Sequence, residues 1–436
     1  MKRYLYKLIA HYLSLYIRND DLVVEINPNN DSIIRNFQNG KVFFTNSEKN
    51  NLEIFKDILW HNLSIKPDYI ILNGNVHYEN DVQTFLVKIK EICKPSTRFI
   101  FIYYSSLWKP FLQFLTFLNL RRKTAEQNWI SHDDIDNLLR LSDYELVKKE
   151  NKILCPIYIP LLSYILNRFF APIIFFRFFA LLNIAIAKPL NKTRQSQHSV
   201  SIVIPARNEA GNIEKLLLKI PKMGNDDEII FIEGNSTDNT WDTIVEVAGK
   251  YKDKYNILIG KQEGKGKGDA VRKGFSMATK DVFMILDADI SVPPEDLTKF
   301  YEAIITDKGE FINGSRLVYP MDKKAMRFFN IIGNKFFAFG FSFVLGQKFK
   351  DTLCGTKVLS KENYLKIVKN RNYFGDFDPF GDFDLLLGAS RLGLRIVEVP
   401  ITYRERTYGD TNIQRWKHGV LLLKMLIFSA LKIKFI

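Results

Sequence analysis

The chain has 436 residues, of which 46% are hydrophobic and 25% charged, a composition that excludes a disordered or fibrous protein. Lysine and arginine exceed aspartate and glutamate by 62 − 48 = 14. This excess favours an anionic partner, which can be nucleic acid, an anionic membrane face or a phosphorylated substrate. Cys93, Cys155 and Cys354 show neither a pairing pattern nor metal-ligand spacing, which excludes a disulfide scaffold and a zinc finger.

The apolar N-terminal stretch, residues 1–17, carries basic residues and lacks a small-residue cleavage site, so no signal peptide is expected. No run reaches the roughly 18 uncharged apolar residues that a membrane-spanning helix needs. Segments 156–190 and 418–436 are apolar but interrupted by basic residues, which favours helices lying in a membrane interface. The alternative is a core helix with a solvated end. We predict a cytoplasmic protein, peripheral to the inner face of the cell membrane.

The first half alternates short β-branched runs with helical patterns, which predicts a parallel α/β sheet. Strands are expected at 22–26, 41–44, 69–72 and 98–103, with a helix at 81–92. This order resembles the class I S-adenosylmethionine-dependent methyltransferases over about residues 20–155. The turn after the first strand, at 27–31, has no glycine, and the acid expected after the second strand is replaced near Asn46. Asparagine adopts the left-handed backbone that such a turn uses, so the resemblance implies a retained fold without an intact cofactor site.

The second half places polar motifs after apolar strands. Strand 200–204 leads into Pro-Ala-Arg-Asn-Glu at 205–209, and strand 228–232 leads into Glu-Gly-Asn-Ser-Thr-Asp at 233–238. A Gly-Lys-Gly-Lys-Gly stretch follows at 264–268, and strand 282–286 runs into Asp287-Ala288-Asp289. In this order the four motifs resemble the family-2 inverting glycosyltransferases of the GT-A fold over about residues 199–415.

Asp287 and Asp289 are the candidate metal ligands. A nucleotide-sugar diphosphate is a polyanion, and Mg²⁺ or Mn²⁺ neutralises it through carboxylates and phosphate oxygens. The resemblance implies a nucleotide-sugar pocket drawn from all four motifs: Pro205, Ala206, Arg207, Glu209, Glu233, Lys265, Gly266, Asp287 and Ala288. The second acid common in the Glu233 turn is Gly234 in this chain.

Later motifs narrow the resemblance to the dolichyl- and polyprenyl-phosphate mannose synthase type. They are Gly-Ser-Arg at 314–316, the loop 351–357 and the segment 403–409. A lipid phosphate is already anionic at neutral pH, so arginines that place it matter more than a base. Arg316 and Arg406 are expected to hold phosphates bidentately, the alternative being structural salt bridges. Two positions depart from that group: Asn412 replaces a lysine and Ser291 replaces a glutamine.

An acidic cluster at 376–384 is consistent with a second kind of acceptor, a sugar hydroxyl. A neutral sugar hydroxyl needs a general base, and Asp382 or Asp384 fits that role, with helix N-capping as the alternative. The helix expected within 327–345 is apolar on several faces, which indicates either lipid contact or burial.

We therefore predict an α/β chain with a methyltransferase-like α/β domain at 1–155, an apolar and basic linker at 156–198, a GT-A glycosyltransferase domain at 199–415 and a basic amphipathic helix at 416–436. The expected reaction is metal-dependent inverting transfer from GDP-mannose or a UDP-hexose to a polyprenyl-phosphate-type lipid carrier, with Asp289 and both arginines as catalytic residues.

Three alternatives stay open. They are transfer to a sugar hydroxyl of a glycan or glycolipid in the cell envelope, a bifunctional enzyme that also transfers methyl groups, and a non-catalytic binding protein. The expected partners are a nucleotide-diphosphate sugar, an anionic lipid carrier or glycolipid, and a membrane surface. No nucleic-acid module is recognised, so nucleic acid is not expected to bind.

Overall fold

The computed structural model describes residues 2–27, 32–43, 66–79, 81–90, 93–119, 128–190, 198–319, 328–373, 383–406, 408 and 415–436. The chain divides into two compact units. Unit 1 comprises Met1–Lys192 with Lys434–Ile436, and unit 2 comprises Thr193–Ile433. No helix among these described residues is both long and apolar enough to cross a membrane.

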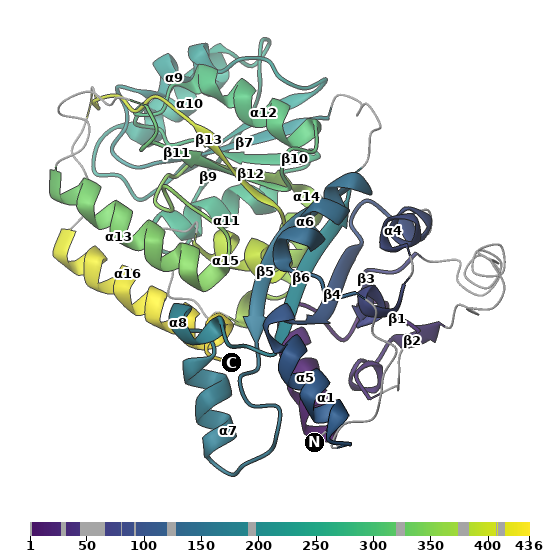
Figure 1. Cartoon of the computed structure of the whole chain (residues 1–436). Helices are drawn as coiled ribbons and strands as arrows, with labels where there is room; N and C mark the ends of the chain where they lie inside the picture. The colour runs from purple at the N-terminus through teal and green to yellow at the C-terminus, as the bar shows by residue number, and fades with distance from the viewer. Residues whose placement is uncertain are drawn as a thin grey trace. The chain divides into compact units, whose positions relative to one another are not determined.

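Unit 1 is built on a six-stranded sheet in the order β2-β1-β3-β4-β6-β5 (Figure 1). Its strands are β1 Val23–Ile26, β2 Gly40–Phe43, β3 Tyr69–Asn73, β4 Arg98–Tyr104, β5 Tyr144–Lys152 and β6 Leu182–Pro189. The first four pair in parallel, whereas β6 is antiparallel to both β4 and β5. Apolar runs such as β3 and β4 are buried on both faces, as parallel strands covered by helices require.

The helices of unit 1 are α1 Lys2–Leu13, α3 Asn75–Tyr78, α4 Val82–Lys90, α5 Lys109–Phe117, α6 His132–Leu141, α7 Leu162–Ile165 and α8 Ile174–Arg177. Short helical turns lie at Ile34–Asn36, Ser106–Trp108 and Leu166–Phe170. Helix α6 begins with a capping box, because the Ser131 hydroxyl accepts from the Asp134 amide while the Asp134 carboxylate accepts from the Ser131 amide.

The segment expected as a linker, 156–198, contains the strand β6. Every residue of β6 is buried, and the strand pairs along its length with β4 and β5. The expectation of a linker is therefore wrong for Leu182–Pro189. A continuous apolar run has no alternation that marks it as a strand, and here its neighbours in the sheet decide its conformation.

Unit 2 has a seven-stranded sheet in the order β13-β11-β12-β10-β7-β8-β9. The strands are β7 Val200–Ala206, β8 Asp227–Glu233, β9 Asn256–Lys261, β10 Val282–Ile285, β11 Phe311–Ser315, β12 Lys357–Ser360 and β13 Ile396–Pro400. Only β12, among these, runs antiparallel to its neighbours. The strands expected at 200–204, 228–232 and 282–286 are confirmed as β7, β8 and β10.

Helices cover both faces of this sheet. They are α9 Ile213–Lys219, α10 Thr240–Lys250, α11 Lys267–Met277, α12 Leu297–Ile305, α13 Phe328–Leu345, α14 Lys361–Val368, α15 Phe383–Arg391 and α16 Arg415–Ser429. Figure 1 shows α9, α10 and α12 on one face and α11, α13 and α15 on the other. Alternate residues of β7 follow this division, because Ile202 packs with the first group whereas Val203 faces Gly274 of α11.

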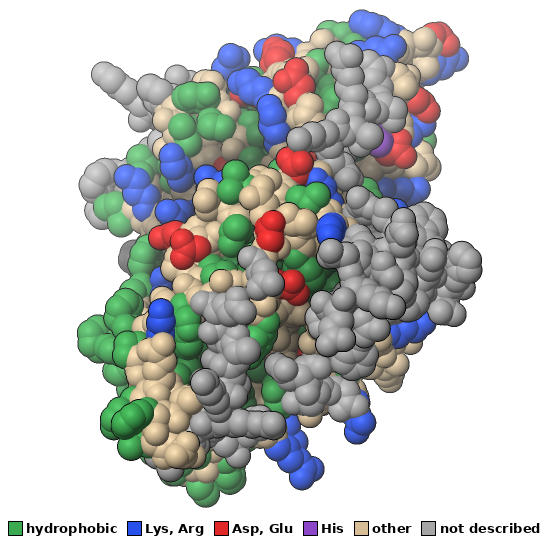
Figure 2. All heavy atoms as spheres, turned by 45° about the vertical axis from the view of Figure 1, so that its right-hand side comes forward, with side chains coloured by type: hydrophobic (Ala, Val, Ile, Leu, Met, Phe, Trp, Pro, Cys, Tyr) green, Lys and Arg blue, Asp and Glu red, His purple; other side chains and the backbone are tan. Residues whose placement is uncertain are grey.

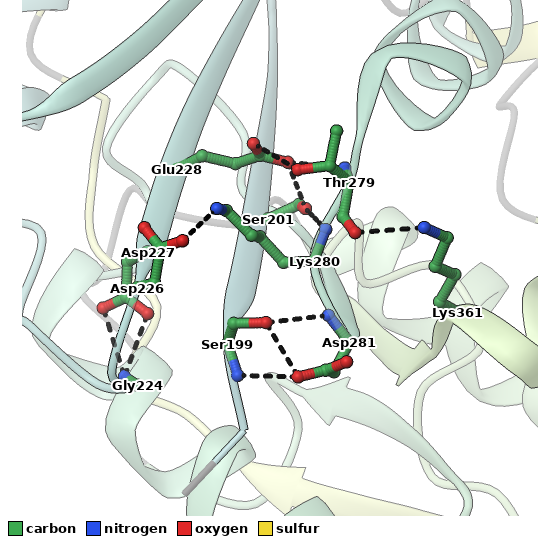
Figure 3. Close-up of polar contacts among 10 residues, drawn as sticks. All are labelled: Ser199, Ser201, Gly224, Asp226, Asp227, Glu228, Thr279, Lys280, Asp281 and Lys361. Atoms are coloured by element: carbon green, nitrogen blue, oxygen red, sulfur yellow. Dashed lines mark hydrogen bonds and ion pairs between the residues drawn. The ribbon is translucent and has the colours of Figure 1, made fainter.

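A polar network fixes the strands at the end of the sheet where β7 and β8 begin (Figure 3). The buried Glu228 carboxylate accepts from the Ser201 hydroxyl at 2.6 Å and from the Thr279 amide at 2.7 Å. Ser199 and Asp281 bond each other through backbone and side chain. These contacts join the start of β7 to the segment before β10 and so fix the register of this pair. That register aligns the carboxyl ends of β7 and β10 with each other.

Candidate active site

The carboxyl ends of three adjacent parallel strands, β10, β7 and β8, carry most of the predicted site residues. Strand β7 ends at Ala206 and continues to Glu209, β8 ends at Glu233, and β10 is followed closely by Asp287 and Asp289. Ligands of open α/β sheets bind at this edge, because the loops there leave the sheet side by side. The sheet topology therefore gathers three of the four sequence motifs at one edge.

Arg406 joins two of these motifs. Its Nη2 lies 2.6 Å from Asp289 Oδ2, and its Nη1 lies 3.3 Å from Glu209 Oε1. The second oxygen of Asp289 accepts from the amide of Ser291 at 3.0 Å and from its hydroxyl at 2.7 Å. Ser291, one of the departures from the synthase pattern, thus orients the Asp289 carboxylate.

The two carboxylates on Arg406 titrate differently. Burial raises the pKa of Glu209 to about 7, although Arg406 and Asn212 oppose this rise. Burial acts in the same direction on Asp289, but there the Arg406 charge and the Ser291 hydrogen bonds prevail and lower its pKa. Glu209 is also acted on by the negative charges of Asp289 and Asp287. Arg406 therefore favours the ionised form of both carboxylates, and burial opposes it most effectively at Glu209.

Lys267, the first residue of α11, pairs with the remaining motif aspartate. Its Nζ lies 2.5 Å from Asp287 Oδ1. Gly266 precedes it with φ 86° and ψ 166°, a backbone region that is essentially restricted to glycine. A Cβ atom on Gly355 would collide with both Asp287 and Lys267, so the loop at 351–356 passes directly against this ion pair. The sequence pointed to Lys265, which is exposed, whereas the helix start places Lys267 on Asp287.

Arg316 forms a structural salt bridge, which was the alternative to holding a phosphate. Its Nε and Nη2 bond the two oxygens of Asp351 at 2.6 and 2.9 Å, and its backbone amide donates to the same carboxylate at 3.1 Å. Glu398 of β13 accepts from the amide of Asp351 at 3.0 Å. Arg316 therefore anchors the loop that carries Gly355, and the bidentate edge expected to hold a phosphate is engaged by Asp351.

The loops after β7 and β8 are bonded to each other. Asn208, at φ 57°, donates its amide to Ser236 Oγ at 3.0 Å, and its side chain accepts from the Thr237 amide at 2.8 Å. Glu233 is buried and accepts from the Ser236 amide at 2.5 Å. A Cβ on Gly234 would lie 3.1 Å from Arg207 Cβ, so a side chain at this position would be in tight contact with Arg207.

The remaining predicted residues occupy different surroundings. In the first motif Arg207 is exposed and Pro205 half-buried, whereas Ala206 and Ala288 belong to the hydrophobic core, so their side chains face away from solvent. Asp384, the second residue of α15, is buried and lies 3.0 Å from Arg371 Nε, and burial raises its pKa above the usual value despite that arginine. Asp382 and Asn412 lie outside the described residues.

Sequence reasoning missed Lys267, Gly355 and Asn208. The helix start after Gly266 is a signal for the first, because it aims the first turn of α11 at the edge of the sheet. The asparagine before Glu209 is a signal for the third, since asparagine is enriched at positive φ. Gly355 lies in the loop 351–357, which the sequence marks as a motif, but its contact with Asp287 and Lys267 depends on that loop folding back from a distant part of the chain.

Asp287 and Asp289 are the residues that would offer carboxylate oxygens to a divalent cation. Among the described residues no group of three or more histidine, cysteine, aspartate or glutamate side chains forms a self-sufficient metal site. Mg²⁺ in phosphate-handling sites takes one or two carboxylates and completes its sphere with phosphate oxygens and water. Asp287 is paired with Lys267 and Asp289 with Arg406, so both carboxylates lie where a positive charge is stabilised.

The chain is similar to known proteins over about half of its length. A family model described as glycosyl transferase family 2 matches residues 201–367. A dolichol-phosphate mannosyltransferase of Pyrococcus furiosus is 31% identical over 221 residues, which are 49% of this chain and 59% of the relative. A dolichyl-phosphate beta-glucosyltransferase of Saccharomyces cerevisiae is 30% identical over 229 residues, 47% of this chain and 67% of the relative.

Among solved structures, glucosyl-3-phosphoglycerate synthase from Mycobacterium tuberculosis is similar at a TM-score of 0.40 with 19% identity, covering 54% of this chain and 80% of that one. No functional conclusion rests on a likeness of this degree. The two sequence relatives, in contrast, are transferases whose names include dolichol phosphate or dolichyl phosphate.

Proposed function

Because the chain belongs to glycosyltransferase family 2, we propose that it transfers a sugar from a nucleotide-diphosphate sugar to a polyprenyl-phosphate-type lipid carrier at the inner face of the cell membrane. The observation that carries this proposal is the Arg406 guanidinium bridging Glu209 and Asp289, with the Asp287–Lys267 pair at the same sheet edge. The relatives named for dolichol phosphate support the lipid acceptor.

Positive and negative charge alternate across this site in a way that suits a diphosphate leaving group. Asp287 and Asp289 would hold Mg²⁺ or Mn²⁺, which stabilises the charge that develops on the diphosphate when bound. Lys267 stands at the start of α11, where its ammonium and the first amides of the helix favour phosphate oxygens. Gly266 leaves room for that approach because it has no side chain.

Arg406 is the residue that would place the acceptor. A phosphate monoester carries negative charge at neutral pH, so its oxygen attacks the anomeric carbon without losing a proton to the enzyme. The proposed roles of Arg406 are to hold that phosphate in line and to keep Asp289 ionised. Arg316, whose bidentate edge holds Asp351, acts in this proposal by positioning the loop at 351–356.

A sugar hydroxyl is the second candidate acceptor, and Asp384 is the observation in its favour. Burial raises the pKa of its carboxyl, and a raised pKa suits a general base. Its pairing with Arg371 opposes that role, because a carboxylate held by a guanidinium is a weaker proton acceptor.

Unit 1 is proposed to keep a methyltransferase-like fold without methyl transfer. Asn27 takes a positive φ of 45° after β1, as expected for a turn that lacks glycine. The buried Asn75 side chain donates to the Ile26 carbonyl at 2.9 Å and so occupies the end of that strand. Tight binding of S-adenosylmethionine by the full chain would instead favour a bifunctional enzyme.

A donor screen tests the proposed transfer. Radiolabelled GDP-mannose, UDP-glucose and UDP-N-acetylglucosamine are each incubated with short polyprenyl phosphate and Mg²⁺ or Mn²⁺. We expect label in the organic phase with one donor and its loss in Asp289→Ala. Asp226→Ala is the matched control, since Asp226 is bonded to Lys280 at the other end of the sheet (Figure 3).

The two acceptors give different outcomes in the same screen. Donor turnover with label on a water-soluble glycan, lost in Asp384→Asn, would move the assignment to a sugar hydroxyl. Absence of turnover with every donor and metal, from a protein that is folded, would leave a binding protein and overturn the transferase proposal.

A further inference from the structure

Unit 1 exposes an unusual concentration of aromatic side chains on two segments that the proposed reaction does not use. We call residues 106–118 and 157–179 the aromatic apron. Its most exposed members have between 53% and 81% of their surface accessible: Phe114, Phe117, Tyr158, Leu161, Tyr164, Ile174, Phe175 and Phe178. Apolar side chains exposed singly are ordinary, but a contiguous set marks a surface that is covered in function.

A hydrogen bond joins the two segments within unit 1, and ring contacts order each of them. Trp108 Nε1 at the start of α5 donates to the Phe179 carbonyl after α8 at 3.0 Å. The Phe175 ring lies 5.9 Å from the Phe179 ring, and the Trp108 ring lies 5.4 Å from that of Phe111 on α5. Figure 1 shows α5, α7 and α8 in unit 1, and Figure 2 shows hydrophobic side chains exposed on the face that it draws.

Buried polar side chains hold the apron in this outward arrangement. Asn167 accepts from the Cys155 amide and donates to the Cys155 carbonyl, both at 2.8 Å. The buried Ser163 hydroxyl donates to the Ile159 carbonyl at 2.8 Å. Leu161, which lies between Ile159 and Ser163 in the chain, takes φ 62°, a strained conformation for a leucine, with its side chain directed to solvent. The exposure is therefore a feature of an ordered segment with its own hydrogen bonds.

The charged residues of the two segments indicate what kind of partner covers the aromatic apron. The sequence has no acidic residue between Glu150 and Glu209, and none between Glu91 and Glu126, so neither segment contains a carboxylate side chain. Both contain basic residues: Lys109 in the first, and Arg168 and Arg177 in the second. The Arg168 guanidinium lies 5.5 Å from the ring centre of Tyr164 and 5.8 Å from that of Phe169.

We propose that the aromatic apron docks unit 1 on the headgroup region of an anionic phospholipid bilayer. Amphipathic aromatic rings and arginines without acids are the composition that settles at this interface, with the rings among the acyl chain ends and the cations at the phosphates. The apron lies outside the matched residues 201–367, so this docking is independent of the proposed transfer.

Flotation with vesicles tests the docking. The full chain is mixed with vesicles of phosphatidylcholine, or of equal parts phosphatidylcholine and phosphatidylglycerol. We expect the parent to float with the anionic vesicles, and Phe117→Ser/Phe175→Ser/Phe178→Ser to lose about tenfold or more in partition coefficient. Leu218→Ser/Val245→Ser/Leu365→Ser, which changes exposed apolar residues of unit 2, is the matched control and should float like the parent.

A second variant tests the charge, and two measurements keep the outcomes distinct. Arg168→Gln/Arg177→Gln is expected to lose the preference for anionic vesicles and its sensitivity to salt. The phenylalanine variant should keep its unfolding temperature and its transfer to short polyprenyl phosphate in detergent, which separates docking from catalysis. Unchanged flotation of a folded phenylalanine variant, or a lipid-free dimer that this variant splits into monomers, would overturn the proposal.

Discussion

Arg406 holds Glu209 and Asp289 with two different nitrogens of one guanidinium, at 3.3 and 2.6 Å. A lysine carries the same charge as a single ammonium without the planar fork, so it cannot reproduce both contacts in this geometry. We therefore expect Arg406→Lys to lower kcat/KM about a hundredfold, a loss of roughly 3 kcal/mol in transition-state stabilisation. Steady-state kinetics with the donor found in the screen measures this.

Arg404→Lys is the control for that substitution. Arg404 is exposed, and its backbone amide donates to the Ser291 carbonyl at 2.9 Å, a contact that a lysine keeps. The control should behave like the parent. An Arg406→Lys variant as active as this control would mean that charge alone suffices at position 406.

The titration of Glu209 makes the stability of the folded chain depend on pH. Its pKa of about 7 in the folded chain lies above the value of about 4.3 expected after unfolding. The folded state therefore binds more protons between these values, and its stability falls as pH rises from about 4.5 to 7. Glu209→Gln removes this titration.

The stability difference between Glu209→Gln and the parent should consequently shift in favour of the variant between pH 5 and 8. We expect a shift of about 1 to 3 kcal/mol. Urea unfolding of both proteins without donor or metal, at several pH values across that range, measures it. A difference that stays constant with pH would show that Glu209 is ionised at all of them.

These site residues also show what sequence can supply. Glu209, Asp287 and Asp289 were predicted because each follows an apolar strand of a parallel sheet, and the carboxyl ends of such strands meet at one edge. Arg406 was predicted as a phosphate ligand, but its two carboxylate partners depend on how a loop returns from the end of the unit. Arg316 required the same information, because its partner Asp351 lies in a different loop.

At the scale of elements, the loop at 351–356 is held between a strand and the site. The Arg316–Asp351 pair and Glu398 of β13 fix it, and Gly355 rests against Asp287 and Lys267. Gly355→Ala forces the Asp287 and Lys267 side chains, or the loop itself, to shift, because the added methyl overlaps both side chains. We expect donor KM to rise about tenfold or more with a smaller change in stability.

Gly249→Ala provides the comparison for the loop. Gly249 lies in α10 with open space around its Cβ position, so alanine there should stabilise the chain by about 0.5 to 1 kcal/mol and leave donor KM unchanged. Donor KM and thermal unfolding of both variants are measured together. If Gly355→Ala bound the donor normally, the loop and the ion pair would accommodate the methyl group without affecting the donor site.

The same scale explains why β6 escaped prediction. Its run Leu-Asn-Ile-Ala-Ile-Ala-Lys-Pro at 182–189 is mostly apolar and ends at a proline, a pattern shared by interfacial helices and buried strands. Two neighbours distant in sequence, β4 and β5, supply its hydrogen bonds. A local pattern contains no information on such partners, whereas β7, β8 and β10 were marked by the polar motifs that follow them.

At the scale of the whole chain, its last residues return to unit 1 and complete a buried charge cluster. Lys148, Lys152 and Lys434 surround Glu150, with nitrogen–oxygen distances of 3.2 to 3.3 Å. Burial lowers the pKa of Lys152 to about 8, with Glu150 opposing this and the other lysines adding to it. The Lys152 ammonium also lies 4.7 Å from the ring centre of Tyr12 on α1. The three buried amines therefore share the Glu150 carboxylate.

This imbalance predicts opposite effects for two substitutions of similar size. Glu150→Gln removes the carboxylate that the three buried amines share and should destabilise unit 1 by about 3 kcal/mol or more. Lys434→Met removes one repelling charge and keeps the packing, so it should lie within about 1 kcal/mol of the parent or above it. Hydrogen exchange of the β5 and β6 amides follows unit 1 alone and measures both. Equal losses in the two variants would mean that the Lys434–Glu150 attraction outweighs the repulsion among the lysines.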